Sequence, residues 1–319
     1  MQTSSFRAAS AFVLPLALTT TSCSGSTGAT VALDASVPST DADSATSEPS
    51  AGDAGSSSEQ PSDAGDAPVG SAADAAPVFS EGGVPIADGG GLNPAVPPSS
   101  NFDLSTWELD LPTTPTSTET SAALLAGFTD PYFFTGTDGA MVMWCPLTGG
   151  LTANAHYPRS ELREVQNGSA AAWSVAAGTA ALAATVAVNE VPPNGTVIVG
   201  QIHEGGTGIY PLVKLLFEAP NGVGTVVANV QLAAASASGQ NHAIVSGIPL
   251  NQLFSYRILL QPDGTLSVSV DDTTMTVAID PSFMGSQLYF KAGSYPQQEE
   301  EAGADGSRVS VYSLAVSHT

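Results

Sequence analysis

The stretch at residues 256–270 reads YRILLQPDGTLSVSV and decides the class of the fold. Residues 256–261 and 266–270 alternate apolar with polar side chains, which is the pattern of β-strands that bury one face. Between them, Gln261-Pro-Asp-Gly264 supplies residues that favour a tight turn. We therefore predict two antiparallel strands joined as a hairpin.

Runs of the same kind recur along the chain and are separated by Gly, Pro, Asn and Asp. They lie at residues 180–188, 196–203, 212–218, 225–232, 275–279, 288–292 and 309–316. Helical periodicity is scarce, and we expect only a short helix at residues 122–127 and a helical turn at residues 281–285. The pattern predicts an all-β sandwich or jelly roll.

The chain has two parts of very different composition. Residues 24–98 contain eleven acidic residues, no Lys, Arg, Trp or Tyr, and mostly Ser, Ala, Gly, Pro and Asp. Such a segment cannot bury enough apolar surface to offset the entropy lost on folding, so we predict a disordered acidic linker. All three Trp and all seven Tyr residues follow residue 101. Residues 99–319 are therefore expected to form one domain.

The N-terminus has the features of a secretory signal. Arg7 precedes an apolar run at residues 8–18 that is too short to span a bilayer, and small polar residues lead to Cys23. We predict that residues 1–23 form a secretory signal peptide of the lipoprotein type and that the protein is secreted. Thr20-Thr-Ser-Cys23 also approximates a lipobox, and acylation of Cys23 would give a cell-surface lipoprotein anchored in the outer membrane. Ordinary signal cleavage near this position, without a lipid, is the alternative. In the lipidated form, the charged linker would hold the domain away from the membrane.

The domain carries a single cysteine, Cys145, so it can form no internal disulfide. Its neighbours Met143, Trp144 and Pro146 provide no basic group that would activate a thiol, and we assign Cys145 to the core. No Cys or His cluster has zinc spacing, and no acidic loop has the ligand spacing of a calcium site. We expect no metal and no cofactor.

The few basic residues of the domain are concentrated. Residues 99–319 hold 19 acidic and 6 basic residues, a formal charge of 6 minus 19, or −13, which would repel nucleic acid and most other polyanions. Half of the six cations, Arg159, Arg163 and Lys291, nevertheless lie in three polar segments, and Lys214 is a fourth candidate. A local basic surface of this kind would attract an acidic polymer.

Each of these three segments places polar groups on one face of a presumed strand, since side chains alternate with a period of two. The residues that share a face are Arg159, Glu161 and Arg163 in the first segment, Gln201 and His203 in the second, and Tyr289, Lys291 and Tyr295 in the third. Each group alone has a structural explanation, as a salt-bridge ladder, a satisfied histidine or a core tyrosine. Their joint occurrence predicts a polar functional surface backed by the core.

Three motifs occur here in order: Arg159-Ser-Glu-Leu-Arg163, Gln201-Ile-His203 and Tyr289-Phe-Lys-Ala-Gly-Ser-Tyr-Pro-Gln297. They resemble the motifs R-[ST]-E-L-R, Q-[IV]-H and Y-F-K-A-G-x-Y-x-Q of the alginate lyases of polysaccharide lyase family 7. Residues 101–107, NFDLSTW, resemble the family's opening strand, so the resemblance spans residues 101–319. It implies a concanavalin A-like β-sandwich jelly roll with a substrate groove on the concave sheet.

The resemblance implies a carbon–oxygen lyase that cleaves 1,4-linked uronate polymers by β-elimination. Arg159, Gln201 and His203 would surround the uronate carboxylate, where donors stabilise the charge that develops when H5 is removed. Tyr295 would protonate the leaving 4-oxygen. His203 would be the base for guluronate, whereas Tyr295 would be both base and acid for mannuronate. Ile202 resembles family members that favour guluronate-containing stretches.

Further residues are expected to bind the rest of the polymer. The three cations among them would contact carboxylates of neighbouring sugars, and Glu161 would stay ionised and orient the two arginines. The expected partner is alginate, bound by a monomer that touches a membrane only through a lipid at Cys23. The substrate-binding residues expected beside the catalytic ones are Arg163, Lys291, Lys214, Glu161, Tyr289 and Gln297.

The sequence leaves other functions open. A related lyase could act on another polyuronate such as glucuronan with the same chemistry. A glycoside hydrolase would need paired carboxylates, with Glu161 and Glu164 or Glu204 as candidates, but Glu161 and Glu164 point to opposite faces. A non-catalytic lipoprotein that binds acidic glycans would need neither His203 nor Tyr295.

Overall fold

The computed structural model describes residues 91–152, 155–205, 210–299 and 305–319. The expected signal segment at residues 1–23, with Cys23, and most of the linker at residues 24–98 lie outside the described residues. Sixteen strands, two short α-helices and two 3₁₀ turns make up the described part of the chain.

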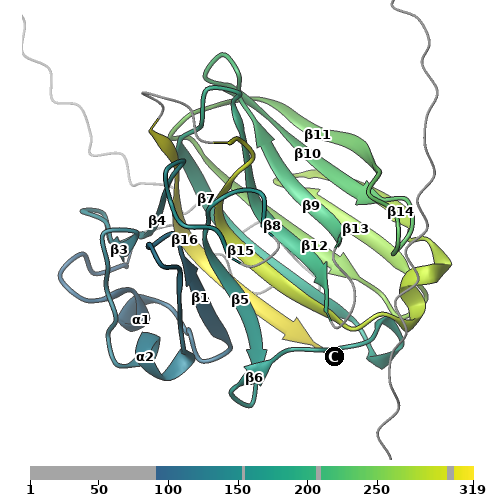
Figure 1. Ribbon diagram of the computed structural model, residues 1–319. Coiled ribbons are helices and arrows are strands. Elements are labelled where there is room, and N and C mark those ends of the chain that lie inside the picture. Colours follow the sequence, from purple (N-terminus) through teal and green to yellow (C-terminus); the bar gives the residue numbers. More distant parts are fainter. Residues whose placement is uncertain (1–90, 153–154, 206–209, 300–304) are drawn as a thin grey trace, which may run out of the picture. The chain divides into compact units, whose positions relative to one another are not determined.

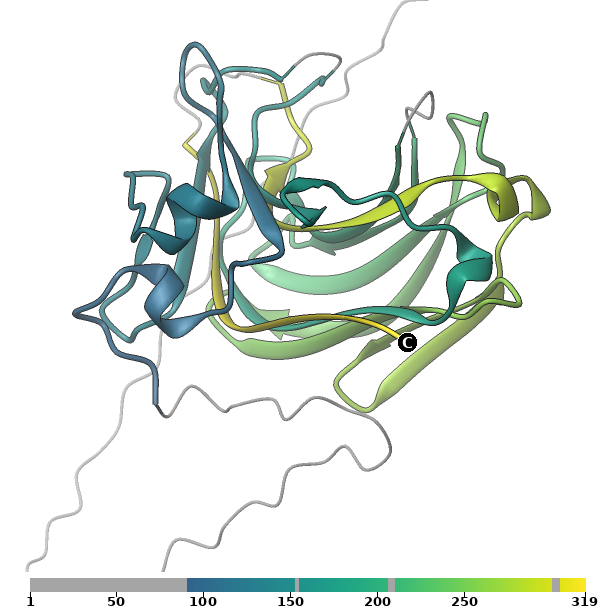
Figure 2. The same cartoon turned by 90° about the horizontal axis from the view of Figure 1, so that it is seen from below.

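The strands form two antiparallel sheets that pack face to face (Figure 1, Figure 2). In spatial order, the nine-stranded sheet contains β11 (Gly239–Pro249), β10 (Val223–Gln231), β9 (Pro211–Glu218), β8 (Thr196–Glu204), β15 (Leu288–Pro296), β5 (Ser160–Gln166), β1 (Trp107–Leu111) and β2 (Ser117–Glu119), with β6 (Ser169–Ala170) paired to β5. The seven-stranded sheet contains β14 (Thr273–Ala278), β13 (Thr265–Val270), β12 (Leu253–Leu260), β7 (Ala180–Glu190), β16 (Gly306–His318), β4 (Met141–Pro146) and β3 (Phe133–Thr135).

Neighbouring strands in the sheets are often far apart in the sequence. β15 lies between β8 and β5, and β16 lies between β7 and β4. Such crossings between two antiparallel sheets are typical of jelly-roll sandwiches. The predicted all-β sandwich class is confirmed.

The predicted hairpin is present as β12 and β13, which pair with Tyr256 opposite Val270. At its turn, Gly264 has a φ of 83° and donates its N–H to the Gln261 carbonyl at 3.0 Å. The expected short helix is α2 (Ser121–Leu125), and the expected helical turn is η2 (Pro281–Gly285). The described part also contains α1 (Pro98–Asn101) and η1 (Val175–Ala177).

Strand β11 has no counterpart among the runs predicted from the sequence. It is the outer strand of the nine-stranded sheet, where it pairs with β10, and most of its side chains are exposed or half-buried. Because β11 buries no continuous face, its sequence lacks the alternation on which the prediction depends.

The packed chain begins before the domain boundary expected at residue 99. Leu92 packs against the core, and Pro98 is buried at the first position of α1. The side-chain amide of Asn101 also donates to the Asn93 carbonyl at 2.9 Å. Residues 91–98 therefore belong to the domain, because a few apolar residues within an otherwise polar segment are enough to dock them.

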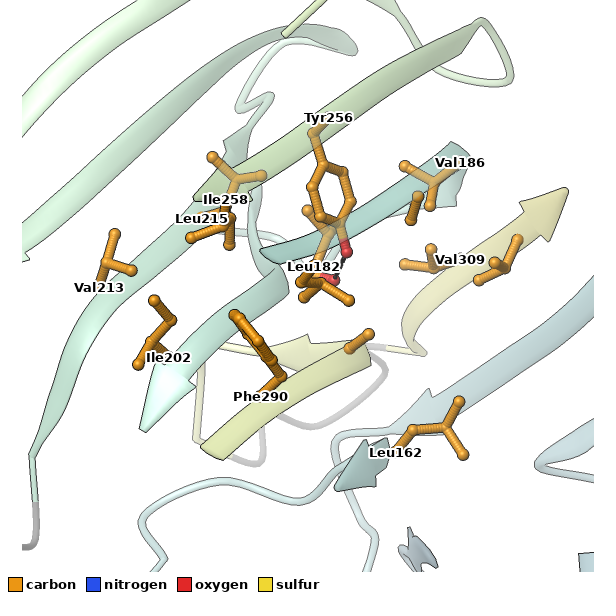
Figure 3. Close-up of a cluster of buried hydrophobic side chains, with 14 of the residues drawn as sticks. Leu162, Leu182, Val186, Ile202, Val213, Leu215, Tyr256, Ile258, Phe290 and Val309 are labelled. Atoms are coloured by element: carbon orange, nitrogen blue, oxygen red, sulfur yellow. Dashed lines mark hydrogen bonds between the residues drawn. The ribbon is translucent and has the colours of Figure 1, made fainter. Parts of the chain in front are cut away.

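The core lies between the two sheets, and three neighbouring strands of the nine-stranded sheet contribute to it in the same way. Figure 3 shows Leu162 of β5, Ile202 of β8 and Phe290 of β15, all fully buried within the cluster. Because side chains alternate along a strand, the residues on either side of these three point away from the core. The packing of the core thus decides which residues reach the opposite face of the sheet.

Tyr256 of the seven-stranded sheet reaches across the core to β8. Its hydroxyl donates to the Val199 carbonyl at 2.8 Å, drawn as a dashed line in Figure 3, and burial raises the pKa of this phenol. Gly200 leaves room for the ring, because a Cβ there would lie 2.9 Å from the Tyr256 hydroxyl oxygen and 3.1 Å from its ring carbons. This contact fixes the chain immediately before Gln201.

Replacing Gly200 with alanine is expected to destabilise the domain by about 1–3 kcal/mol, because the added methyl group overpacks the core against Tyr256. Urea unfolding would measure the change in the free energy of unfolding. Gly285→Ala is the matched control, since a Cβ at that position meets no atom within 4 Å. Equal stability of the two variants would contradict this account of the packing.

Candidate active site

The outward side chains of β5, β8 and β15, together with Arg159 just before β5, form a surface that we call the polar face. They flank Leu162, Ile202 and Phe290, whose side chains fill the core. The three segments come together because β15 lies between β5 and β8, as the joint occurrence of their motifs predicts. The members of the polar face are Arg159, Glu161, Arg163, Gln201, His203, Tyr289, Lys291 and Tyr295.

The strand register sets the neighbours on this face. Lys291 of β15 lies between Arg163 of β5 and Gln201 of β8. Gln201 in turn lies opposite Lys214 of β9. Side chains directly opposite each other on antiparallel strands are within reach of one another, so these residues form a continuous row across four strands.

Glu161 is fully buried and lies at the centre of the hydrogen bonds on the polar face. Its Oε1 accepts from the side-chain amide of Gln201 at 2.5 Å. Its Oε2 lies 2.7 Å from the Lys291 ammonium and 3.3 Å from an Arg159 guanidinium nitrogen. A buried carboxylate needs partners of this kind to offset the hydration that it loses.

The expectation that Glu161 orients both arginines is correct for Arg159 and wrong for Arg163. Arg163 pairs instead with Glu108 of β1, at 3.5 Å, and its guanidinium lies 4.4 Å from the ring centroid of Tyr289. The strand register is the reason, because it places Glu108 directly opposite Arg163. The Tyr289 ring therefore packs against the Arg163 guanidinium, and Tyr289 is itself largely buried.

From its charge, Lys291 is expected to bind a neighbouring sugar; in the structure its ammonium lies against carboxylates of the protein. Only 4% of its side chain is exposed, and its ammonium lies 2.7 Å from Glu161 and 3.4 Å from Asp110 of β1. Lys214 differs from it. The Lys214 side chain is half-buried, burial lowers its pKa, and no carboxylate of the described residues forms an ion pair with it. Lys214 is thus placed to meet an external carboxylate.

His203 presents an unprotonated nitrogen on the polar face. Its Nδ1 lies 2.7 Å from the Glu204 carbonyl oxygen, which can only accept a hydrogen bond, so Nδ1 carries the proton and Nε2 keeps its lone pair. Burial, together with the charges of Lys291 and Arg159, lowers the pKa of His203 to about 4. The ring is therefore neutral at neutral pH. Tyr289 stacks against it, with the ring centroids 5.3 Å apart.

Tyr295 lies beside Arg159, whose guanidinium carbon is 4.0 Å from the centroid of the tyrosine ring. Burial raises the pKa of the Tyr295 phenol although Arg159 opposes the shift, so the hydroxyl is protonated at neutral pH. The side-chain amide of Gln297 lies 3.4 Å from the Tyr295 carbonyl oxygen. Gln297 therefore supports the end of β15, beside Tyr295. The apolar side chains against which the ring packs are Ile198, Leu216 and Val227.

Two residues of the site were not found by sequence reasoning. Tyr157, two positions before the first motif, lies with its ring centroid 6.3 Å from that of Tyr295. Asp110 reaches Lys291 from β1. Asp110 alternates with apolar neighbours in Trp107–Leu111, but only the sheet order, which places β1 beside β5, shows that it faces this site.

The three glutamates considered for a hydrolase are all engaged elsewhere. Glu161 binds the donors of Gln201, Lys291 and Arg159. Glu164 points to the other side of β5, where it accepts from the Trp173 indole nitrogen at 2.8 Å and pairs with His318 at 2.6 Å. Glu204 accepts from the hydroxyl of Ser286. Glu161 and Glu164 point to opposite sides of β5, and each of the three carboxylates already accepts hydrogen bonds from protein groups, so they do not form the free acid–base pair of a hydrolase.

Three further observations concern the described residues. No group of three or more His, Cys, Asp or Glu side chains in this part of the chain is arranged to hold a metal ion. Among the same residues, no helix is long and apolar enough to cross a membrane. Cys145 is buried, as expected, and burial raises the pKa of its thiol.

The chemistry of the polar face defines the class of the protein. Arg159 and Gln201 can donate hydrogen bonds to a carboxylate. Neutral His203 can accept a proton, and protonated Tyr295 can donate one. Together they can remove a proton next to a carboxylate and protonate a leaving oxygen without a nucleophile or a pair of free carboxylates. The sandwich and this site define a polysaccharide lyase.

Comparison with known proteins gives the family. The family model for alginate lyase matches residues 102–318, and the chain belongs to this family. An alginate lyase from Klebsiella pneumoniae is 28% identical over 287 residues, which cover 70% of this chain and 92% of the relative. The crystal structure of alginate lyase PA1167 from Pseudomonas aeruginosa is 36% identical, with a TM-score of 0.65, and covers 68% of this chain and 100% of that one. The family 7 alginate lyase A1-II', solved as a variant in complex with the substrate GGMG, is 36% identical, with a TM-score of 0.66, and covers 71% and 98% of the two chains.

The lowered pKa of His203 predicts that stability depends on pH. The folded protein takes up this proton near pH 4, whereas the unfolded chain takes it up near 6.5. The unfolded state therefore binds more protons between these values, so this contribution is fully present above about pH 6.5 and is lost as the pH falls toward 4. The loss is at most on the order of 3 kcal/mol. Urea unfolding of the wild type and of His203→Gln at several pH values would measure it, and identical slopes in the two proteins would contradict a buried neutral ring.

Proposed function

We propose that this enzyme cleaves alginate by β-elimination on the polar face. Arg159 and Gln201 bind the carboxylate of the reacting uronate, His203 removes H5, and Tyr295 protonates the leaving oxygen. The observation that carries this assignment is the orientation of His203, whose Nδ1–H is held by the Glu204 carbonyl so that Nε2 is left as an acceptor. The family and the related enzyme in complex with the substrate GGMG support alginate as the polymer.

The carboxylate of the substrate is the group whose developing negative charge most needs to be stabilised. H5 is weakly acidic, and removing it spreads negative charge into the adjacent carboxylate. Donors fixed in advance around that group stabilise the transition state more than the ground state. Arg159 and Gln201 meet this requirement because Glu161 already holds one donor of each side chain in place.

His203 suits the role of the base. Its ring is neutral, Nε2 keeps its lone pair, and the stacked Tyr289 ring fixes the plane of the imidazole. The pKa of about 4 belongs to the protein without substrate. A bound uronate carboxylate adds a nearby negative charge, which raises the pKa of the histidine and makes it a stronger base when it is needed.

Tyr295 suits the role of the acid, because burial keeps its phenol protonated. An ionised Tyr295 would be required for it to act as the base, and the raised pKa disfavours that form. This division of labour, with His203 as base and Tyr295 as acid, is the one that the family resemblance links to guluronate. We therefore propose a preference for guluronate-containing stretches. Ile202 can affect that preference only through its neighbours, because its own side chain is fully buried in the core.

Neighbouring sugars bind along the row of side chains that crosses the strands. Lys214 lies beyond Gln201 on β9 and has no carboxylate partner among the described residues. Arg163 lies on the other side of Lys291, and 31% of its side chain is exposed. These two cations would contact carboxylates on either side of the reacting uronate.

The assay of the full-length protein follows the ultraviolet absorbance of the conjugated double bond that elimination creates. We expect it to rise on polyguluronate and more slowly on polymannuronate. A rise on glucuronan alone would keep the mechanism and change the polymer. No rise on any of the three, with binding intact, would contradict catalysis and favour a glycan-binding protein.

Tyr295→Phe and His203→Gln are each expected to lower kcat on polyguluronate by about 10²–10⁴-fold with little change in KM, because each removes one proton-transfer group. Tyr312→Phe is the matched control, since the Tyr312 hydroxyl bonds to Asp138 from β16 of the other sheet. Normal turnover by Tyr295→Phe would exclude tyrosine as the acid.

We also propose that the enzyme is an exported monomer, and that residues 1–23 are its signal and residues 24–98 mostly its spacer. The support is the sequence itself: an apolar run after Arg7, a lipobox-like Cys23, and an acidic segment without Lys or Arg. Expression with labelled palmitate tests the lipid. The label should be present in the wild type and absent from Cys23→Ser, whereas equal labelling of both would contradict acylation at Cys23.

A further inference from the structure

We infer that Asp110 and Lys291 are positioning residues of the elimination reaction: with Glu161 they form a buried ion network that fixes the donors Arg159 and Gln201. This inference rests on the proposed function and deepens it. It assigns a role to Asp110, and it replaces the substrate-binding role expected for Lys291.

Lys291 is placed to act on protein groups and not on a sugar. Its neighbours Phe290 and Ala292 are buried in the core, its strand lies between β5 and β8, and its ammonium meets two carboxylates. With 4% of its side chain exposed, it can reach a substrate carboxylate only by abandoning one of these partners. Burial of a lysine is costly unless its charge is matched, and here it is matched twice.

The register explains why a cation is needed at this point. Asp110 of β1 lies directly opposite Glu161 of β5. Two like charges directly opposite each other destabilise an antiparallel pair, and more so when one of them is fully buried. The Lys291 ammonium comes from the next strand and contacts both carboxylates, which cancels their repulsion.

The orientation of Glu161 controls both donors. Its Oε1 binds Gln201, and its Oε2 is shared by Lys291 and Arg159. If the carboxylate turned, both donors would be released together. Asp110 is held in turn, because its Oδ1 accepts from the Thr118 hydroxyl of β2 at 2.9 Å while its Oδ2 faces Lys291. The network thus runs from β2 through β1, β15 and β5 to β8.

The same charges act on His203. Besides its burial and its hydrogen bond to the Glu204 carbonyl, the groups that set its pKa are Lys291 and Arg159, which lower it, and Glu161, which raises it. Loss of the Lys291 charge should therefore raise the pKa of His203. A Lys291 side chain that extended into solvent toward a distant sugar would be screened by water and would change this pKa little.

The test compares Lys291→Met, Asp110→Asn and the double variant in the full-length protein. For Lys291→Met we expect kcat on polyguluronate to fall on the order of 10- to 100-fold with little change in KM, because displaced donors lose their alignment. The acidic limb of kcat/KM should also move to higher pH. Asp110→Asn keeps the shape of the side chain and should cost only a few-fold.

The double variant, Lys291→Met with Asp110→Asn, tests whether Lys291 acts by cancelling the repulsion between Asp110 and Glu161. Asp110→Asn removes the repulsion that Lys291→Met leaves behind, so the double variant should recover part of the activity lost in Lys291→Met. Lys214→Met serves as the contrasting variant, because loss of a cation that binds the polymer should raise KM more than it lowers kcat. A Lys291→Met variant that behaves like Lys214→Met, or a double variant with no recovery, would overturn the inference.

A nuclear magnetic resonance titration of His203 separates this inference from the proposed function, because it needs no turnover. The histidine ring signals should titrate at higher pH in Lys291→Met than in the wild type, with both proteins checked for folding by circular dichroism. An unchanged titration would count against the network even if the enzyme is active. A wild type that forms no double bond on alginate would count against the proposed function alone.

Discussion

The three neighbouring strands β5, β8 and β15 place core residues on one side and the residues of the polar face on the other. Because side chains alternate along a strand, the positions of these two sets depend on each other. Leu162, Ile202 and Phe290 are fully buried, and each sits between two residues of the polar face. A slip of one residue in any of these strands would bury its charged groups and expose its core residue. The hydrophobic packing between the sheets therefore directs the side chains of the polar face outward.

The electrostatics of the site follow from the same constraint. The chain has only 7 basic residues against 30 acidic ones, so a carboxylate-rich polymer can be attracted only where cations are gathered. Gathering them on adjacent strands requires acidic residues between them, because like charges repel across a sheet. Glu161, Glu108 and Asp110 supply these counter-charges. The cations of the polar face are therefore balanced by nearby carboxylates, which leaves a few donors available to an incoming carboxylate.

Much of this arrangement can be read from the sequence, and what cannot has a physical reason. The hairpin at residues 256–270 and the three polar segments follow from local periodicity and motifs. The ion-pair partners cannot be read from the sequence, since Arg163 pairs with Glu108 and Lys291 with Asp110 only because β1 lies next to β5. The edge strand β11 has no buried face to reveal it, and residues 91–98 dock through single apolar residues that segment composition averages away.

The ion pair between Asp110 and Lys291 joins residues that are 181 positions apart in the chain. Contacts of such long range form slowly, because the entropy of closing the intervening loop must be offset before they stabilise anything. A folding intermediate could assemble the central hairpins while β1 is still undocked. In such a species Lys291 would still pair with Glu161 but would lack its second counter-charge, Asp110. Because Trp107, Leu109 and Leu111 of the same strand are core residues, the docking of β1 completes the core and the charge balance of the site in one step.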